Sequence, residues 1–333
     1  MKRLKGIYLL EAQSFPLIYG PAEQQDIARH IDIIAPLQTR ESIRTDASAL
    51  AEAEVIFSGW GAPRMDEAFL AAAPKLRAVF YGAGTTGYFT TDAFWDRDIV
   101  LTSAYAANAV PVADYTLGVI LLSLRHFWSY SRHAKAGGPW GDQTRPMPGG
   151  FKTTVALIGC GMIARRLITL LRPFDLNCVV CDPFLDEFEA EQLGVTRCSL
   201  EEAFSRGDIV SLHAANRRET YGMITGEHFE LMKPGATFIN TARGAIVREN
   251  EMIRVLQERA DLNAVLDVCH SEPPLPASPL LTLKNVVLTP HIAGSHASEI
   301  RRLGRYMVDE LNRYRAGEPL RWQITRELSA RLA

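Results

Sequence analysis

Residues 153–182, TTVALIGCGMIARRLITLLRPFDLNCVVCD, decide the fold of this chain. An apolar run ends at Gly159, and Gly161 and Ala164 complete the pattern G-x-G-x-x-A. A helix-like stretch and a second apolar run then lead to Asp182. The order of strand, glycine turn, helix, strand and acid is typical of a dinucleotide-binding βαβ unit. We therefore expect an α/β chain with a doubly wound Rossmann domain.

Each part of this stretch has a physical task in binding a dinucleotide. Gly159 permits the tight turn, and Gly161 lets the backbone approach a pyrophosphate. Met162 and Ile163 open the helix, whose N–H groups and positive dipole end attract the phosphates. The carboxylate of Asp182 suits a ribose 2′-OH and would repel a 2′-phosphate. No arginine stands close after Asp182 in the sequence, so the expected cofactor is NAD.

Composition restricts the remaining possibilities. The 333 residues suggest two domains, and a hydrophobic content of 47% is enough for sizeable cores. The formal charge of −2 gives no basis for binding nucleic acid or an anionic membrane. No apolar run approaches the roughly 20 residues of a membrane helix. Five cysteines without framework spacing predict reduced thiols and a cytoplasmic location, and no metal site is expected.

Strand and helix patterns alternate on both sides of a change near residue 104. The first part predicts strands at 4–10, 32–35, 55–58, 76–81 and 99–102, with helices at 22–31 and 66–73. After the βαβ unit, the second part predicts strands at 209–213, 236–240, 263–267 and 286–289, and helices at 226–232, 249–259 and 296–315. Such alternation indicates parallel sheets in both parts.

A long apolar helix is predicted from Pro111 to about Tyr130. Residues 134–150 are rich in Gly and Pro and should form a surface excursion. Two interpretations remain open, because the helix and loop could form an arm that packs on a partner subunit or could be a buried connection.

Ligands of doubly wound sheets bind beyond the carboxyl ends of the strands. Titratable or cationic residues come after most strands of the second part: His213, Arg243, Asp267, Glu272 and His291. His213 could line the cofactor or merely end its strand. Asp267 could touch the nicotinamide amide or simply cap its strand.

Three of these residues form a set suited to hydride transfer between a 2-hydroxy acid and a 2-oxo acid. Arg243 can hold the substrate carboxylate in a bidentate pair and polarise the carbonyl. His291 can move the proton that accompanies the hydride. Glu272 can orient His291 and favour its protonated form. The nicotinamide carries the hydride itself.

These motifs resemble the D-isomer-specific 2-hydroxyacid dehydrogenases. Residues 240–244 (NTARG) are similar to that family's arginine motif, residues 267–273 to its D-V-x-x-x-E-P segment, and residues 289–294 (TPHIAG) to its histidine motif. The resemblance implies that Arg243, Glu272 and His291 are catalytic. It also implies cofactor contacts at Thr241, Ala242, Asp267, His291 and Gly294.

The resemblance implies a domain organisation as well. A smaller, flavodoxin-like substrate domain would comprise residues 1–103 and 296–333, and the NAD-binding domain would comprise residues 104–295. A homodimer would form through the helix and loop at 111–150. The backbone at Gly82, Ala83 and Gly84 would meet the substrate carboxylate, and Asn108 would lie in the cleft.

The chain departs from the family pattern at two places. Ala164 replaces the third glycine, and Ala214-Ala215-Asn216 comes after His213 where the family usually has a proline. Glu272 stands where the formate-oxidising branch has an amide, which argues against formate.

The expected activity is NAD-dependent interconversion of a D-2-hydroxy acid and its 2-oxo acid, with the substrate's side chain left open. Two alternatives stay open. One is a non-catalytic NAD-sensing corepressor or scaffold, and the other is an NADP-preferring glyoxylate or hydroxypyruvate reductase.

Overall fold

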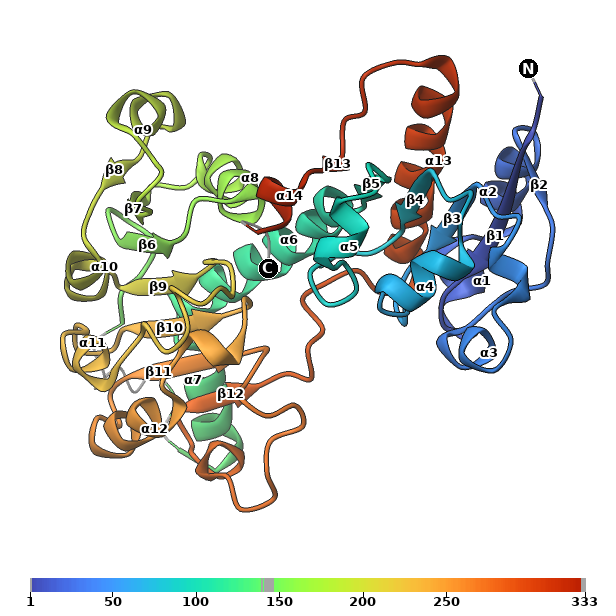
Figure 1. Ribbon diagram of the computed structural model, residues 1–333. Helices are drawn as coiled ribbons and strands as arrows, with labels where there is room; N and C mark the ends of the chain where they lie inside the picture. Colours follow the sequence, from blue (N-terminus) through green and yellow to red (C-terminus); the bar gives the residue numbers. More distant parts are fainter. Residues whose placement is uncertain (1, 139, 141–146, 331–333) are drawn as a thin grey trace. The chain divides into compact units, whose positions relative to one another are not determined.

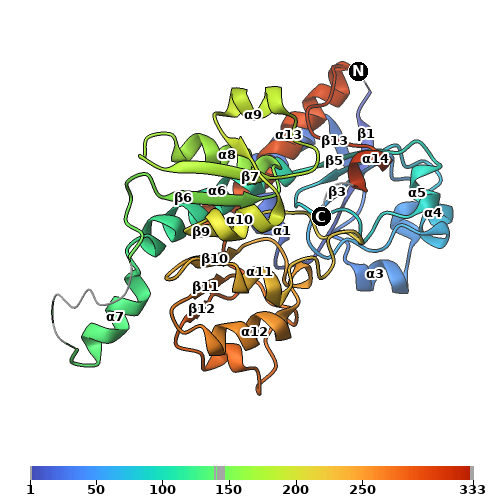
Figure 2. The ribbon, with the colours of Figure 1, turned by 90° about the vertical axis from the view of Figure 1, so that its left-hand side faces the viewer.

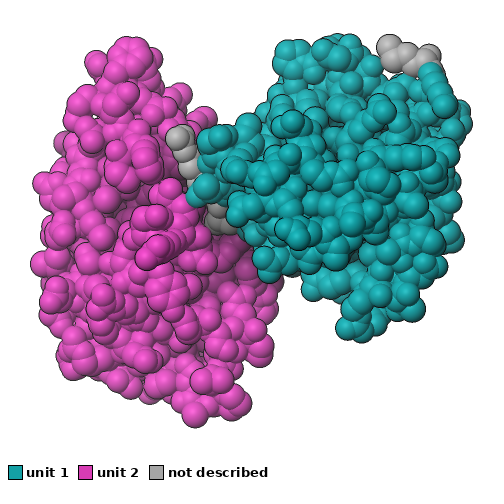
Figure 3. Space-filling model, viewed as in Figure 1, with its two compact units in different colours: residues 1–108, 295–333 teal, residues 109–294 magenta. Residues whose placement is uncertain are grey.

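The computed structural model describes residues 2–138, 140 and 147–330. The chain forms two compact units (Figure 3): unit 1 comprises residues 1–108 and 295–333, and unit 2 comprises residues 109–294. The chain passes between the units after Asn108 and after Gly294. The sequence suggested boundaries after residues 103 and 295, so the first boundary lies five residues later and the second lies one residue earlier than suggested.

Unit 2 contains a fully parallel seven-stranded sheet in the order β12-β11-β10-β9-β6-β7-β8 (Figure 1). The strands are β6 (Thr154–Ile158), β7 (Asn177–Cys181), β8 (Thr196–Arg197), β9 (Ile209–Leu212), β10 (Thr237–Asn240), β11 (Asn263–Leu266) and β12 (Val286–Leu288). The chain first adds β7 and β8 next to β6 on one side, and then adds β9, β10, β11 and β12 on the other side of β6. The topological switch point therefore lies between β6 and β9, where such sheets bind ligands.

Helices cover both faces of this sheet, with cores of buried aliphatic and aromatic side chains between the layers. On one face, seen together in Figures 1 and 2, are α10 (Leu200–Arg206), α11 (Gly226–Glu230) and α12 (Glu249–Glu258). On the other face are α8 (Met162–Leu171) and the second half of α6 (Tyr105–Ser123), and α9 (Glu187–Leu193) comes after β7. Short 3₁₀ turns lie at Gly244–Ile246 and Pro279–Leu281.

The predicted helix from 111 to about 130 is wrong at both ends. Helix α6 begins at Tyr105 and contains Pro111 in its interior, and α7 (Phe127–Lys135) is a separate helix that begins after His126 with φ +48°. Among the described helices, α6 alone has the length and apolar composition to cross a membrane, although more than half of it is buried within the protein. Residues 139 and 141–146 of the predicted excursion lie outside the described residues.

Unit 1 contains a six-stranded sheet in the order β13-β5-β4-β3-β1-β2, parallel except for β13. The strands are β1 (Leu4–Leu9), β2 (Ile31–Ile33), β3 (Val55–Ser58), β4 (Ala78–Tyr81), β5 (Val100–Ser103) and β13 (Gln323–Ile324). One core includes residues of α3 (Arg40–Thr45), α4 (Glu67–Ala72) and α5 (Asp92–Trp95), and a second includes residues of α1 (Phe15–Ile18), α2 (Pro21–Ala28) and α13 (Ile300–Ala316). The 3₁₀ turns at Ser48–Leu50 and Ala297–Glu299 and the short α14 (Arg326–Ser329) complete the unit.

Helix α13 begins four residues later than the predicted start at 296, because residues 297–299 form the 3₁₀ turn. It packs against α1, α2 and β4. Its apolar side chains Leu303, Met307 and Leu311 are fully buried in the unit 1 core. The last part of the chain is thus an integral layer of the unit formed by the first part.

Candidate active site

The glycine turn after β6 fits a dinucleotide pyrophosphate. Gly159 has φ +95°, and a Cβ there would lie 2.7 Å from the backbone nitrogen of Ala214, so only glycine suits the position. Helix α8 starts next, with Gly161 as its N-cap and no atom within 4 Å of the place where a Cβ would be. The first N–H groups of α8 have no partner within the helix. The turn is therefore an open cradle at a positive dipole end.

Asp182 fixes this turn. One carboxylate oxygen accepts the N–H of Cys160 at 2.6 Å, and the other accepts the N–H of Phe184 at 2.8 Å. Each oxygen retains capacity for a second hydrogen bond. The predicted contact with a ribose hydroxyl is compatible with this geometry, and the sequence did not reveal the backbone contacts.

Arg217 is a residue that sequence reasoning missed. Its guanidinium carbon lies 5.6 Å from the ring centroid of Phe184, which itself is 72% exposed. The Nε atom of Arg217 is buried and has no hydrogen-bond partner among the described residues. An arginine thus reaches the turn after Asp182 in space, although none comes closely after it in sequence. No local pattern could have revealed this contact, because β8, α9, α10 and β9 separate the two segments.

His213 ends β9 directly beside the glycine turn. Its backbone N–H donates to the carbonyl of Ile158 at 2.7 Å, and its Nε2 pairs with the hydroxyl of Ser211 at 2.9 Å. Its Nδ1 is buried without a partner among the described residues. Burial lowers the pKa of His213 to about 4, so the imidazole is neutral at pH 7. An unpaired buried nitrogen at this edge fits a cofactor-lining role.

Arg243 lies after β10 in a turn that Asn240 braces. The Asn240 side chain accepts the N–H of Ala242 at 3.0 Å and donates to the carbonyl of Arg243 at 3.2 Å. A Cβ at Gly244 would lie 2.0 Å from the backbone of Cys269, so this turn packs tightly on the segment after β11. Burial lowers the pKa of Arg243, and the negative charge of Glu272 opposes that shift. The guanidinium stays charged, because even a shifted arginine titrates far above neutrality.

Of the remaining residues predicted to contact the cofactor, Thr241 and Ala242 are buried in this turn. The Thr241 hydroxyl lies 3.4 Å from that of Thr116 on α6. Gly294 ends unit 2, directly before the second passage of the chain into unit 1.

His291 and Glu272 form a direct pair. Nδ1 of His291 lies 2.7 Å from Oε2 of Glu272, and the two side chains are 50% and 38% exposed. The carboxylate can only accept, so Nδ1 carries the proton and Nε2 is the nitrogen left for exchange. His291 has φ +54°, a left-handed conformation that is strained for a residue with a side chain.

Asp267 holds the turn that carries His291. Its carboxylate is 2% exposed and accepts three hydrogen bonds, from the Thr289 hydroxyl at 2.6 Å and from the N–H groups of Ile292 and Ala293 at 2.8 and 2.9 Å. Its backbone carbonyl accepts the N–H of His291 at 3.0 Å. Asp267 therefore does more than cap its strand, and one lone pair remains for a nicotinamide amide.

The predicted substrate-binding backbone lies in unit 1, after β4. The hydroxyl of Ser103 lies 2.8 and 2.6 Å from the carbonyl oxygens of Ala83 and Gly84 and shares its single proton between them. The N–H of Gly82 donates to the carbonyl of Ser58 at 2.8 Å. No atom lies within 4 Å of a Cβ position at Gly84. The hydrogen bonds fix the orientation of the peptide planes at residues 82–84, and the backbone at Gly84 has open space beside it.

Asn108 uses its side chain within unit 1. Its carbonyl oxygen accepts the N–H of Ser295 at 2.9 Å. The bond joins the two segments where the chain leaves and re-enters the unit. A predicted substrate contact at Asn108 would have to come from the amide nitrogen.

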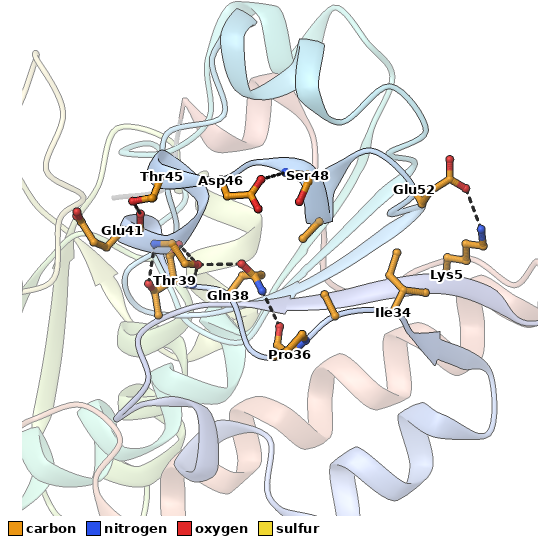
Figure 4. A pocket seen from close by; sticks show the side chains of 13 residues that line it. Lys5, Ile34, Pro36, Gln38, Thr39, Glu41, Thr45, Asp46, Ser48 and Glu52 are labelled. Atoms are coloured by element: carbon orange, nitrogen blue, oxygen red, sulfur yellow. Dashed lines mark hydrogen bonds and ion pairs between the residues drawn. The ribbon is translucent and has the colours of Figure 1, made fainter.

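Unit 1 also contains a hollow of about 960 Å³ between the segment after β2 and α3 (Figure 4). Its polar side chains bond one another or nearby backbone: Glu52 pairs with Lys5, and Asp46 accepts the N–H of Ser48. It includes none of the predicted site residues. In the part of the chain that the structure describes, no group of three or more His, Cys, Asp or Glu residues could hold a metal.

The sequence and the fold of this chain are similar to those of known proteins. A family model described as the NAD-binding domain of D-isomer specific 2-hydroxyacid dehydrogenases matches residues 117–293. The (S)-sulfolactate dehydrogenase of Chromohalobacter salexigens is 32% identical over 292 residues, covering 84% of this chain and 94% of that protein. The D-3-phosphoglycerate dehydrogenase of Archaeoglobus fulgidus is 29% identical over 259 residues, which cover 78% of this chain but 49% of that protein.

The chain thus spans about half the length of the D-3-phosphoglycerate dehydrogenases that it matches. Among solved structures, the D-mandelate dehydrogenase of Rhodotorula graminis superposes with a TM-score of 0.83 at 23% identity, covering 98% of both chains, which establishes the shared fold. The glycine turn, the strand-end residues and the family match lead to one conclusion. This chain belongs to the D-isomer specific 2-hydroxyacid dehydrogenases, a family of oxidoreductases, and contains their NAD-binding domain.

Proposed function

We propose that this protein interconverts a D-2-hydroxy acid and its 2-oxo acid with NAD(H), using Arg243, Glu272 and His291. The observation that carries the proposal is the 2.7 Å pair between His291 and Glu272, in the same unit as the glycine turn and with Arg243 within the electrostatic reach of Glu272. Bound NADH supplies the hydride. The protein's task is then to hold the acid and to provide one proton.

The roles of the three residues can be derived from their contacts. Glu272 holds Nδ1 of His291, so Nε2–H is the donor that gives its proton to the carbonyl oxygen as C2 is reduced. Arg243 grips the carboxylate and draws electron density from the carbonyl. Its partly buried setting strengthens that attraction, because fewer water molecules screen the charge. In the oxidative direction His291 accepts the same proton.

The open backbone at Gly82–Gly84 is the proposed second anchor for the substrate carboxylate. Ser103 binds two carbonyls of this segment and the N–H of Gly82 donates to Ser58, which leaves the N–H groups of Ala83 and Gly84 as the donors suited to an anion. Unit 1 would then supply the substrate's side-chain pocket. The related proteins are named for sulfolactate, phosphoglycerate and glyoxylate, so acids with and without a second anionic group are candidates.

The test is NADH oxidation with a panel of 2-oxo acids: glyoxylate, pyruvate, hydroxypyruvate, sulfopyruvate and phenylglyoxylate. We expect turnover with at least one of them and a loss of about 10²–10⁴-fold in kcat for His291→Gln, the contribution typical of general acid–base catalysis. Parallel binding titrations with NADH and NADPH test the cofactor preference assigned to Asp182. Turnover that is equal in parent and variant would refute the role of His291.

A homodimer in a reducing, cytoplasmic compartment is part of the same proposal. The segment from α6 to β6 exposes large apolar side chains, with Trp140 94% and Phe151 71% exposed, and no residue of α7 is buried. Exposed apolar groups of this size favour a partner surface. The five cysteines are all free thiols. Light scattering of the parent and of Phe151→Asp measures the assembly, and a monomeric parent would contradict it.

A further inference from the structure

The turn that carries His291 is connected to helix α6 by a chain of side-chain hydrogen bonds. Tyr115 on α6 lies 2.9 Å, hydroxyl to hydroxyl, from Thr289, and Thr289 lies 2.6 Å from the Asp267 carboxylate. All three residues belong to unit 2, and none of them contacts Glu272 in the described hydrogen bonds.

The direction of this chain is fixed by chemistry. A carboxylate can only accept, so the Thr289 hydroxyl donates its single proton to Asp267. Thr289 therefore has only lone pairs left, and the Tyr115 hydroxyl must donate to it. Each bond polarises the next, so the chain strengthens the grip of Thr289 on Asp267. Burial raises the pKa of the Tyr115 phenol, which keeps this donor protonated across the physiological range.

The far end of the chain acts on a strained backbone. Asp267 accepts the N–H groups of Ile292 and Ala293, the two residues after His291, whose own φ is +54°. A left-handed residue persists only where the surroundings over-determine it. Three hydrogen bonds to Asp267 hold this conformation: the N–H groups of Ile292 and Ala293 donate to its carboxylate, and the N–H of His291 donates to its backbone carbonyl.

We propose that Tyr115 is a positioning residue for His291, acting through Thr289 and the Asp267 carboxylate on the backbone of residues 291–293. The inference rests on the proposed role of His291. In this arrangement Glu272 orients the imidazole ring from one side, and the chain from α6 holds the main chain that carries it. Because α6 also carries the chain out of unit 1, the setting of His291 depends on the helix that connects the units.

The test uses single and double variants with a matched control. Tyr115→Phe removes one hydroxyl, Thr289→Val removes the central link, and Thr289→Ser retains it. Tyr130→Phe is the control: the residue as a whole is partly exposed, but its hydroxyl oxygen is buried without a hydrogen-bond partner in the part of the chain that is described. We expect kcat to fall about fivefold for Tyr115→Phe and about tenfold or more for Thr289→Val, the size expected for lost hydrogen bonds to a charged network.

Three further readouts separate positioning from general damage. The Kd for NADH should stay within about twofold of the parent, and Thr289→Ser should restore most of kcat. The double variant Tyr115→Phe/Thr289→Val should be no worse than Thr289→Val alone, because both act through one chain. In the protein without cofactor, the imidazole NMR signal missing in His291→Gln should shift in Tyr115→Phe and stay in place in Tyr130→Phe.

Specific outcomes overturn the inference. Full kcat in Tyr115→Phe, additive losses in the double variant, or an unmoved His291 signal would each show that Tyr115 does not position His291. These results differ from a failure of the proposed function, in which His291→Gln itself would retain full turnover.

Discussion

The two sheets of this protein share an architecture and differ in the residues placed at the ends of their strands. In unit 1, β3 and β4 end in glycine-containing segments, Gly59–Gly61 and Gly82–Gly84, which contain no titratable side chain. In unit 2, the strands end in a glycine turn and then in His213, Arg243, Asp267 and His291. Parallel α/β sheets bring all their carboxyl ends to one edge, so the side chains at that edge, not the fold, determine the chemistry.

The largest expected effect is a loss of kcat, and it tests whether the catalytic residues lie in unit 2. Glu272→Gln keeps the shape of the side chain but removes the charge that holds Nδ1 of His291. We expect kcat to fall about 10²-fold with the NADH Kd unchanged, measured by stopped-flow and fluorescence titration. Glu258→Gln, which alters a surface pair with Arg254, is the control. Equal losses in both variants would contradict a specific role for Glu272.

A second prediction concerns the glycine turn. Gly159→Ala places a side chain at φ +95° and against the backbone of His213 and Ala214, so we expect a loss of about 3 kcal/mol or more in unfolding free energy. Gly161→Ala meets no atom within 4 Å and should leave that stability unchanged while weakening NADH binding. Urea unfolding measures the stability of the two variants, and titration measures their affinity for NADH. Equal unfolding free energies for Gly159→Ala and Gly161→Ala would show that the turn does not require a glycine at position 159.

A third prediction concerns acid stability. The pKa of His213 is about 4 in the folded protein, below the value of about 6.5 for an unfolded chain. Between these values the unfolded chain binds a proton that the folded protein does not, so stability is full above pH 6.5 and falls towards pH 4.

Replacing His213 removes this contribution. Between pH 7 and pH 4 the difference in unfolding free energy between His213→Gln and the parent should therefore shift by about 3 kcal/mol in favour of the variant. Urea unfolding at both pH values measures the difference, with His30→Gln in unit 1 as the control. A difference in unfolding free energy between His213→Gln and the parent that does not change with pH would contradict a neutral His213 with a buried Nδ1.

The smallest effect sharpens the comparison of the two edges. Gly84 in unit 1 and Gly161 in unit 2 both have open space where a Cβ would be. Gly84→Ala should raise KM for the 2-oxo acid about fivefold without changing the NADH Kd, because its backbone is the proposed anchor of the substrate. A change in the NADH Kd of Gly84→Ala would contradict this division of tasks between the units. So would an unchanged KM in Gly84→Ala together with an unchanged NADH Kd in Gly161→Ala.

Local patterns predicted the architecture well and the contacts poorly. The glycine turn and the strand ends were readable because each depends on neighbouring residues and on the alternation of strands and helices. The start of α6 was not, because Pro111 looks like a first helical residue, whereas the helix keeps it inside and buries the small side chains around it.

Contacts that depend on tertiary geometry gave no sequence signal. Asp182 binds the backbone of Cys160 and Phe184, and Arg217 reaches Phe184 from another crossover. The left-handed backbone at position 291 gave no sequence signal, because the residue there is a histidine and not a glycine. It is imposed by Asp267, which only the folded sheet brings next to it.

The interrupted path of the chain through unit 1 has a consequence for how the protein is made. Residues 109–294 form a contiguous unit, whereas the core of unit 1 lacks α13 until residues 300–316 have left the ribosome. Domains fold as units during synthesis, N-terminal parts first. Here that order is inverted: the nucleotide-binding part can fold co-translationally, while the earlier-made sheet of unit 1 has one apolar face only partly covered by α1 and α2 until α13 is made.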